Sequence, residues 1–288
     1  MIDIIDVLIF GIVSGTILLL GSIGFSLVWK TENFLNITHG QMILLGAYVA
    51  YFFNVVLNWS LLLSAIITVV LTAFVGLLIA KVFFYPVRRH GTLAQLFTSV
   101  GLAYVIYGLV QAFGGVSLKS YNIATNKAFM INDYPIMTLN QLIIVIVAII
   151  SILFLHLFLT QTKQGRGIRA MAGNRQLSET RGIDTEKLSS YVWLIASGLG
   201  GLAGVLLGIY GSLHTELGWE QILIIMSVAV LGGLGSLYGT MIAALLVGIA
   251  MDVSTLFIDS AYRTSIAFFI IILVLLVRSQ GLTRKGVS

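Results

Sequence analysis

Few residues in this sequence have the types and spacing that catalytic or metal-binding chemistry requires. The chain contains no cysteine, which excludes a thiol nucleophile, a disulfide and a cysteine metal site. Its histidines are scattered, and no group of histidine and carboxylate residues has the spacing of metal ligands. Neither paired carboxylates nor a nucleophile with its base can be assembled. We therefore predict no catalytic residue, no metal site and no enzyme activity for this chain.

The longest polar stretch, residues 163–187, reads KQGRGIRAMAGNRQLSETRGIDTEK. It carries six of the sixteen lysine and arginine residues of the chain. A short helix is predicted within it, beginning near Gly167 and ending at Gly182, because glycine is favoured where a helix stops. Such a helix can be held by a soluble partner through its arginines. The alternative is a solvated basic face beside anionic lipid head groups.

Two shorter polar stretches interrupt apolar sequence. In the first, residues 33–41 (NFLNITHGQ), Thr38 and Gln41 have the spacing of a capping box, which predicts a helix N-terminus. The second is the glycine turn 232–239, where Ser236 is expected to cap another helix. Irregular backbone at membrane depth is tolerated only if protein buries it or if it lines a water-filled cavity. Both stretches are therefore candidates for a transport route.

Polar and glycine residues of these stretches are expected along the route. They are Asn36, Thr38, His39, Gly40, Gln41, Glu220, Gly232, Gly233, Gly235 and Ser236. Glu220 is equally expected at the outer mouth of that route. For His39 we favour a hydrogen-bonded structural role over that of a proton carrier.

The composition requires that helices inside a membrane position these stretches. Of the 288 residues, 58% are hydrophobic and 9% are charged, with a mean hydropathy of +1.04, whereas a soluble domain carries about 25% charged residues. We predict one all-α integral membrane domain over 1–288, with about eight membrane-embedded segments and a polar loop at about 117–135 that is long enough for a small surface element. The segments are roughly 7–28, 40–57, 61–80, 92–116, 136–161, 188–211, 221–251 and 264–277.

Glycines shape two of these segments. As one helix, 221–251 would run about 46 Å at 1.5 Å per residue, against a hydrocarbon core of roughly 30 Å. Four glycines within the eight residues 232–239 would also break it. A broken or re-entrant helix pair is therefore predicted near 221–251, as a hairpin or as two short crossings. In 188–211 the glycines are expected to form a face on which neighbouring helices pack closely.

The lysines and arginines divide unequally between the two sides of the membrane. With the N-terminus outside, the inner side collects thirteen of them and the outer side three. Cytoplasmic loops carry the excess of cations, so the C-terminus and loop 163–187 are predicted in the cytoplasm, with no nucleic acid as partner. The thirteen are Lys30, Lys81, Arg88, Arg89, the six of 163–187, Arg278, Arg284 and Lys285, and the three are Lys119, Lys127 and Arg263.

No acidic or basic residue is predicted in the middle of a membrane-embedded segment. A proton- or sodium-coupled carrier usually needs an ionisable relay there, and an ion channel often has a charged ring or a filter sequence. If the chain is a transporter, its energy is expected to enter from outside the membrane domain. A route without charges would guide its cargo rather than bind it tightly.

Several short motifs resemble those of one transport family, in the same order from about residue 8 to residue 277. They are Asn36-Ile-Thr-His-Gly40 with Gly46-Ala-Tyr-Val-Ala50, Gly165-Arg-Gly-Ile-Arg-Ala170, Gly173-Asn-Arg175 through Gly182-Ile183, and Leu231-Gly-Gly-Leu-Gly-Ser236 with Gly239. Each motif is weak singly, and the series is fairly specific. In this series the chain resembles the LivH-type membrane permease subunits of ABC importers for branched-chain amino acids.

The resemblance implies translocation of branched-chain or other hydrophobic amino acids across the cytoplasmic (inner) membrane. It also implies a second, M-type permease, an extracytoplasmic substrate-binding protein and two ATP-binding subunits that hold ATP and magnesium, while this chain binds no cofactor. The loop from Gly165 to Ile183 would be a coupling helix seated in a groove of the ATPase, with arginines 169, 175 and 181 as candidates for salt bridges. The implied coupling residues are Gly165, Arg169, Asn174, Arg175, Glu179, Arg181 and Gly182.

The chain departs from the family pattern at two places, which bear on the substrate and on the ATPase contacts. Residues 178–181 are SETR where small or apolar residues are commoner, and residues 36–38 are NIT where NFA is commoner. Two alternatives follow. One is the same architecture for urea, short amides or sugars, and the other is a self-contained facilitator or channel without an ATPase.

Overall fold

This computed structural model describes residues 4–123, 128–131 and 134–277 of the chain. Within these ranges, seven helices are long and apolar enough to cross a membrane. A shorter apolar helix, Leu217–Gly232, and the helix Arg263–Val277 accompany them. The predicted helical membrane architecture is confirmed.

The elements follow one another with short connections. In chain order the helices are α1 (Ile4–Glu32), α2 (Thr38–Tyr51), α3 (Leu61–Ile79), α4 (Tyr85–Val87), α5 (Thr92–Gly114), α6 (Leu139–Gln161), α7 (Lys163–Gly173), α8 (Arg175–Thr180), α9 (Thr185–Tyr210), α10 (Leu217–Gly232), α11 (Leu237–Ser254) and α12 (Arg263–Val277). Five-residue π-helical turns, Phe52–Val56 and Ala80–Phe84, continue α2 and α3, and 3-10 turns lie at Arg88–His90 and Ser260–Tyr262.

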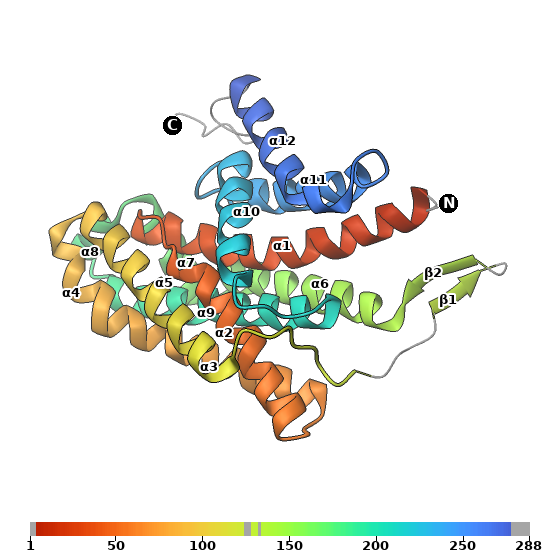
Figure 1. Cartoon of the computed structure of the whole chain (residues 1–288). Coiled ribbons are helices and arrows are strands. Elements are labelled where there is room, and N and C mark those ends of the chain that lie inside the picture. Colours follow the sequence, from red (N-terminus) through yellow and green to blue (C-terminus); the bar gives the residue numbers. More distant parts are fainter. Residues whose placement is uncertain (1–3, 124–127, 132–133, 278–288) are drawn as a thin grey trace.

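Helix α1 lies at the centre of the bundle, with α9 and α11 packed along it (Figure 1). Its apolar stretch is 78% buried inside the protein, whereas that of α6 is 22% buried. Small residues permit this packing, because membrane helices approach closely where side chains are absent. A Cβ on Gly248 of α11 would lie 2.3 Å from the Cα of Gly15 in α1.

The glycines of α9 form the close packing face that the sequence predicts. A Cβ on Gly204 would lie 2.0 Å from the carbonyl oxygen of Ile43 in α2. On Gly201, it would lie 2.0 Å from the hydroxyl oxygen of Thr72 in α3. Both distances are far inside van der Waals contact, so α2 and α3 rest against the backbone of α9.

Helix α2 begins at Thr38 as predicted, but the predicted capping box is wrong. The N-cap residue is Ile37, and no side chain caps the helix. The Thr38 hydroxyl instead donates a hydrogen bond of 2.8 Å to the carbonyl oxygen of Ser99 in α5. The Thr38 side chain thus bonds to another helix, whereas the motif predicts a bond to the backbone amide of Gln41.

The loop at 117–135, which the sequence shows to be long enough for a small surface element, leads into one. It is an antiparallel hairpin of β1 (Ala128–Ile131) and β2 (Tyr134–Thr138), in which Phe129 pairs with Met137. Because β2 extends to Thr138, α6 begins at Leu139 rather than at the predicted residue 136. Thr138 and Gln141 form the capping box of this helix, with bonds of 3.3 and 2.8 Å.

The predicted break within 221–251 is confirmed. Helices α10 and α11 meet at a turn in which Gly233 and Gly235 have φ angles of 91° and 81°, values that favour glycine. The Ser236 hydroxyl caps α11 as predicted, accepting from the backbone amide of Gly239 at 3.2 Å. With 16 residues, α10 is about 24 Å long, short of the roughly 30 Å hydrocarbon core. It runs across α1 rather than along it (Figure 1).

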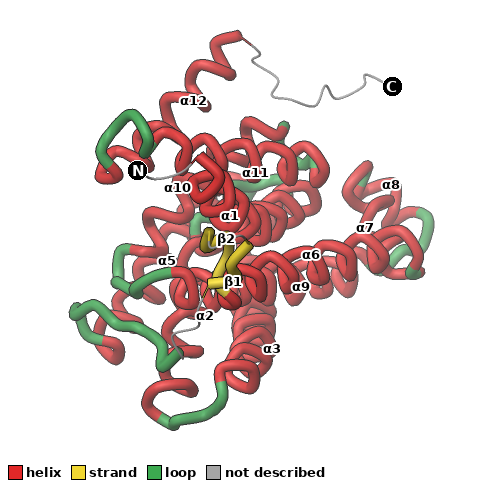
Figure 2. The backbone as a smooth tube through the Cα atoms, turned by 90° about the vertical axis from the view of Figure 1, so that its right-hand side faces the viewer, coloured by secondary structure: helices red, strands yellow, loops and turns green. Residues whose placement is uncertain are grey.

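The two ends of the bundle differ in character. Helices α4, α7 and α8 lie at one end, and the hairpin and the start of α1 lie at the other (Figure 1). Figure 2, which views the bundle from the hairpin end, shows α7 and α8 to one side of the central helices. The first end therefore carries Arg88, Arg89 and the 163–187 loop. The predicted basic tail, Arg278, Arg284 and Lys285, lies outside the described residues.

Candidate functional site

The 163–187 loop contains two short helices rather than the predicted single helix. Asn174 separates α7 from α8 with extended backbone, and its side-chain oxygen accepts from the backbone amide of Leu177 at 2.9 Å. Asparagine is a strong N-cap residue, so a second helix begins here. Helix α8 ends at Thr180, and the glycine predicted to stop it, Gly182, follows two residues later with a φ of +77°.

A Schellman motif closes α8. The backbone amide of Ile183 donates to the carbonyl of Ser178, and that of Gly182 donates to Glu179, each at 3.0 Å. These paired bonds satisfy carbonyls at the end of a helix and need a residue with positive φ. Gly182 therefore supplies the positive φ that this helix end requires.

Helix α7 is wedged against the membrane helices on either side of it. A Cβ on Gly165 would lie 2.1 Å from the carbonyl oxygen of Phe158 in α6, and one on Gly167 would lie 2.8 Å from Leu188 of α9. Ile168 and Met171 are buried on the same helix. Movement of α7 must therefore displace α6 and α9 as well.

A buried carboxylate joins this loop to the centre of the bundle. The side chain of Glu32, at the end of α1, is 1% exposed, and its Oε2 lies 2.6 Å from Nη2 of Arg88. Arg175 of α8 approaches the same oxygen through Nη1 at 3.5 Å. The hydroxyl of Ser189 in α9 donates to Oε1. These residues, here called the Glu32 cluster, connect α1, α8, α9 and the turn before α5.

The other side of Arg175 binds Glu179 and Thr185. Its Nε lies 3.3 Å from Oε1 of Glu179, and the Thr185 hydroxyl donates to that same oxygen at 2.6 Å. The hydrogen bond from Thr185, followed by the bond and charge of Arg175, lowers the pKa of Glu179 below its ordinary value. Two of the predicted coupling residues are thus held within this chain.

The remaining cations of the loop face outward. Arg169 and Arg181 are exposed, and neither makes an ion pair with any residue in the described part of the chain. They stay available to an external partner, so their predicted role in salt bridges remains open to test. Gly165, Asn174 and Gly182 have the structural roles described above.

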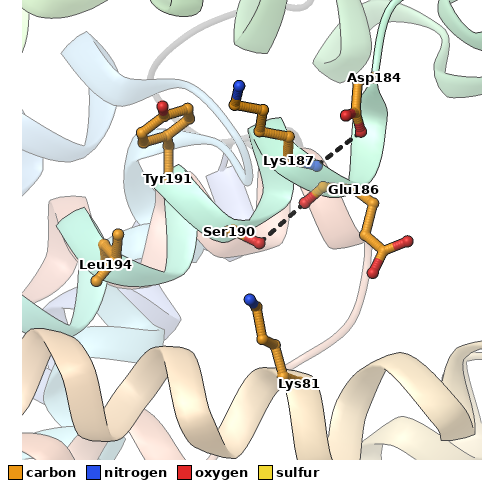
Figure 3. A pocket seen from close by; sticks show the side chains of 7 residues that line it. All are labelled: Lys81, Asp184, Glu186, Lys187, Ser190, Tyr191 and Leu194. Carbon is orange, nitrogen blue, oxygen red and sulfur yellow. Dashed lines mark hydrogen bonds between the residues drawn. The ribbon is translucent and has the colours of Figure 1, made fainter.

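Two cavities flank the start of α9. One, of about 510 Å³, lies between α7 and α9 and includes Lys163, Arg166 and Lys187 in its lining. The other, of about 410 Å³, lies between α9 and the π-helical turn after α3. Figure 3 shows Lys81 of that turn extending toward α9, where the backbone amide of Lys187 bonds to Asp184. The surface around the start of α9, facing α7 on one side and the π-helical turn on the other, is hollowed and carries charge of both signs.

The residues predicted along a transport route separate into two groups. Asn36, Thr38, His39 and Gln41 are each 2% exposed or less, inside the bundle. Gly235 lies instead beside Lys30 near the C-terminal end of α1, where a Cβ on it would lie 3.6 Å from the Lys30 side chain. The glycine turn is therefore not part of the first group.

His39 makes a hydrogen bond of the kind expected for the structural role that was favoured over proton transfer. Its Nε2 lies 2.9 Å from the carbonyl oxygen of Gly21 in α1. The ring fits between two glycines, since a Cβ on Gly24 or on Gly200 would lie 2.9 or 3.3 Å from its Cε1 atom. His39 thus joins α1, α2 and α9.

Glu220, predicted on the route or at its mouth, lies at the surface. Its carboxylate is 54% exposed and lies 3.1 Å from Nε2 of His214. It sits within the first turn of α10, two residues after the buried Gly218. Glu220 is therefore not buried with the first group, and its place at an outer mouth stays a prediction.

Sequence reasoning missed Glu32, Arg88 and Ser189. One signal was present, because Glu32 is the single carboxylate between Asp6 and Asp133. An isolated carboxylate at the end of an apolar segment needs a partner. The identity of that partner, however, depends on the packing of segments distant in sequence.

Comparisons with known proteins agree on one family. A sequence model described as "Branched-chain amino acid transport system / permease component" matches residues 7–277. The permease protein LivH of the high-affinity branched-chain amino acid transport system of Escherichia coli K12 is 29% identical over 94% of this chain and 92% of its own. The corresponding BraD of Pseudomonas aeruginosa is 25% identical over 96% and 94%.

Two more distant similarities add context. The fructose import permease protein FruG of Bifidobacterium longum is 26% identical over 68% of this chain and 59% of its own. The solved structure of PsaBC from Streptococcus pneumoniae, in complex with Fab, has a TM-score of 0.53 and 14% identity, covering 94% of this chain and 90% of that one. At that identity the likeness concerns the fold alone.

Proposed function

Because this chain belongs to the family of branched-chain amino acid transport system permease components, we propose that it is the membrane permease subunit of an ATP-binding-cassette importer. The cargo is a branched-chain or other hydrophobic amino acid. LivH and BraD, which are named as branched-chain amino acid permeases, match 94–96% of the chain. The sugar permeases match 68% and 44% of it, which favours an amino acid over a sugar.

One observation carries the coupling role, namely that the α7–α8 loop is joined to the bundle at a buried charge. Helix α7 is packed against α6 and α9, and Arg175 binds Glu32 at the end of α1. A force on the loop therefore reaches the central helix without passing through a flexible connection. Two ATP-binding subunits, which hold ATP and magnesium, would supply that force. ATP-driven closure then biases the equilibrium between inward- and outward-open states.

The remaining partners and the orientation follow the same proposal. A second, M-type permease completes the membrane domain, and an extracytoplasmic binding protein delivers the amino acid. The end with α7 and α8 lies in the cytoplasm, because cations concentrate there, and the N-terminus lies outside the cytoplasmic membrane. The chain hydrolyses no ATP itself, and its partners do so.

The decisive experiment is reconstitution in proteoliposomes. The chain with its second permease, ATP-binding subunits and loaded binding protein is expected to accumulate leucine only when ATP is supplied. Leucine uptake down its gradient by the purified chain alone, at transport rates, would support a self-contained facilitator instead. Uptake of fructose or urea in place of leucine would favour another cargo.

A second experiment tests the coupling surface. Arg169→Glu with Arg181→Glu reverses two exposed charges of the loop that make no ion pair with another described residue, and should abolish copurification of the ATP-binding subunits. Arg263→Gln, at the opposite end of the bundle and bound to Asp252 at 2.8 Å, is the control and should retain them. Retention by the double variant would exclude these arginines from the contact.

A further inference from the structure

The first turns of α2 and α10 touch inside the bundle. A Cβ on Gly40 would lie 2.4 Å from the carbonyl oxygen of Gly218 and 2.6 Å from the Cβ of Ile222. These are the third residue of α2 and the second of α10. Two helix N-termini, the ends at which a helix dipole carries partial positive charge, therefore lie together. Both helices are longer than eight residues, with 14 and 16.

The side-chain amide of Gln41 lies at this junction. The residue is 0% exposed, and neither its oxygen nor its nitrogen has a hydrogen-bond partner. The amide lies against α10, because a Cβ on Gly218 would be 2.5 Å from its Oε1. A second unpaired group, Oδ1 of the 2% exposed Asn36, lies in the segment that leads into α2.

Neighbouring polar side chains do have partners. Thr38 bonds to the carbonyl of Ser99, and His39 bonds to that of Gly21. Among the polar side chains in the first turn of α2, Gln41 is therefore the one that lacks a hydrogen-bond partner. A buried amide without partners costs free energy that folding does not recover, and a bound ligand would recover it.

The chemistry of the junction matches a zwitterion. Helix N-termini favour carboxylates, and the interrupted helices of transporters place such N-termini at substrate carboxylates. The Gln41 amide can donate to a carboxylate through its nitrogen and accept from an ammonium group through its oxygen. A sugar or urea offers no full negative charge to the helix N-termini.

We propose that Gln41, between the N-termini of α2 and α10, forms a transient binding site for the main-chain carboxylate and ammonium groups of an amino acid during transport. The proposal rests on the proposed function, because it assigns that cargo to one site. In the present conformation Gly218 covers the amide. The substrate therefore reaches it when the first turn of α10 withdraws from α2.

Gln41→Met tests the site, since methionine keeps the length of the side chain and removes both polar atoms. The variant is measured in the complete reconstituted complex, for ATP-driven leucine uptake at saturating loaded binding protein, for subunit copurification and for Tm. Uptake should fall roughly tenfold or more, the loss expected for one hydrogen bond to a charged group. Copurification should be unchanged, and Tm should equal or exceed that of the wild type.

Gln141→Met is the matched control. Gln141 lies in the first turn of α6, where its side-chain oxygen accepts from the backbone amide of Thr138 at 2.8 Å, away from the two N-termini. Its uptake should remain near wild type.

Three outcomes would count against the site. Normal uptake by Gln41→Met overturns it, and so does a fall in Tm that parallels the loss of uptake, because that identifies a structural role. If the wild-type complex itself moves no leucine with ATP, the proposed function fails and the site falls with it. If the wild type transports and Gln41→Met transports equally, only the site fails.

Discussion

Glu32 and Arg88 form an ion pair of 2.6 Å although 56 residues separate them in the chain. The carboxylate is 1% exposed and the guanidinium side chain is 25% exposed, so Glu32 depends on protein partners in place of water more than Arg88 does. Arg175 shares the same carboxylate oxygen at 3.5 Å. One buried acid therefore holds the central helix to the loop that is proposed to receive the force of ATP hydrolysis.

Glu32→Gln should destabilise the protein. It leaves two arginines without their shared anion, and breaking a fully buried pair costs about 3–5 kcal/mol. The cost here should lie below that range, because both arginine side chains are about a quarter exposed. Thermal unfolding of the purified protein measures it. Glu179→Gln is the control with a 51% exposed carboxylate and should lower Tm less; equal shifts would contradict a special role for Glu32.

Arg175→Ala should weaken coupling more than it weakens assembly. The substitution removes the bonds from α8 to Glu32 and to Glu179 but leaves the exposed arginines in place. We expect the ATP-binding subunits to copurify, and leucine uptake per ATP hydrolysed to fall. Gln176→Ala, at an exposed neighbouring position, should leave that ratio unchanged. An unaltered ratio in Arg175→Ala would show that the Glu32 cluster does not transmit the motion.

Gly182→Ala and Gly173→Ala form a matched pair. In both, a Cβ would meet nothing within 4 Å, and only Gly182 has a positive φ, of +77°. Left-handed backbone costs a side-chain-bearing residue about 1–2 kcal/mol, so Gly182→Ala should loosen the end of α8. Gly173→Ala, at the last residue of α7, should be neutral or mildly stabilising. Hydrogen exchange of the 178–183 backbone amides distinguishes the two variants. Equal protection in both would show that the positive φ of Gly182 does not determine the stability of this helix end.

Gly40→Ala should force α2 and α10 apart. The added methyl would lie 2.4 Å from the carbonyl oxygen of Gly218, and overpacking of this kind costs about 1–3 kcal/mol. Gly101→Ala, with open space around its position in α5, is the control and should not lower Tm. A Gly40→Ala protein with wild-type Tm and uptake would mean that the two first turns separate freely.

Acidification should loosen the link between α8 and α9. The folded pKa of Glu179 is depressed, first by the Thr185 hydroxyl and then by Arg175. Its contribution is therefore present above the unfolded carboxyl pKa, near 4.3, and is lost as pH falls through the lower folded value. The difference in exchange protection between wild type and Glu179→Gln should shrink over that acidic window. A difference that persists below it would assign the effect to shape rather than charge.

Local properties of the sequence were enough for much of the fold. The apolar segments, the break at Gly233 and Gly235 and the Ser236 cap depend on nearby residues, and the structure confirms them. The excess of cations in one set of loops likewise follows from counting. Where a motif had a competing distant partner, as Thr38 had in Ser99, the local prediction failed.

What the sequence alone determined is the class of protein, its interrupted helices and the loop on which a partner could act. Hydrophobicity and glycine conformation are properties of short segments, so they can be read without the fold. Only the tertiary structure decided that Glu32 binds Arg88 and Arg175, and that Gln41 is buried against Gly218 without a partner. Those relationships join helices far apart in sequence, and burial sets their energy only once the helices have packed.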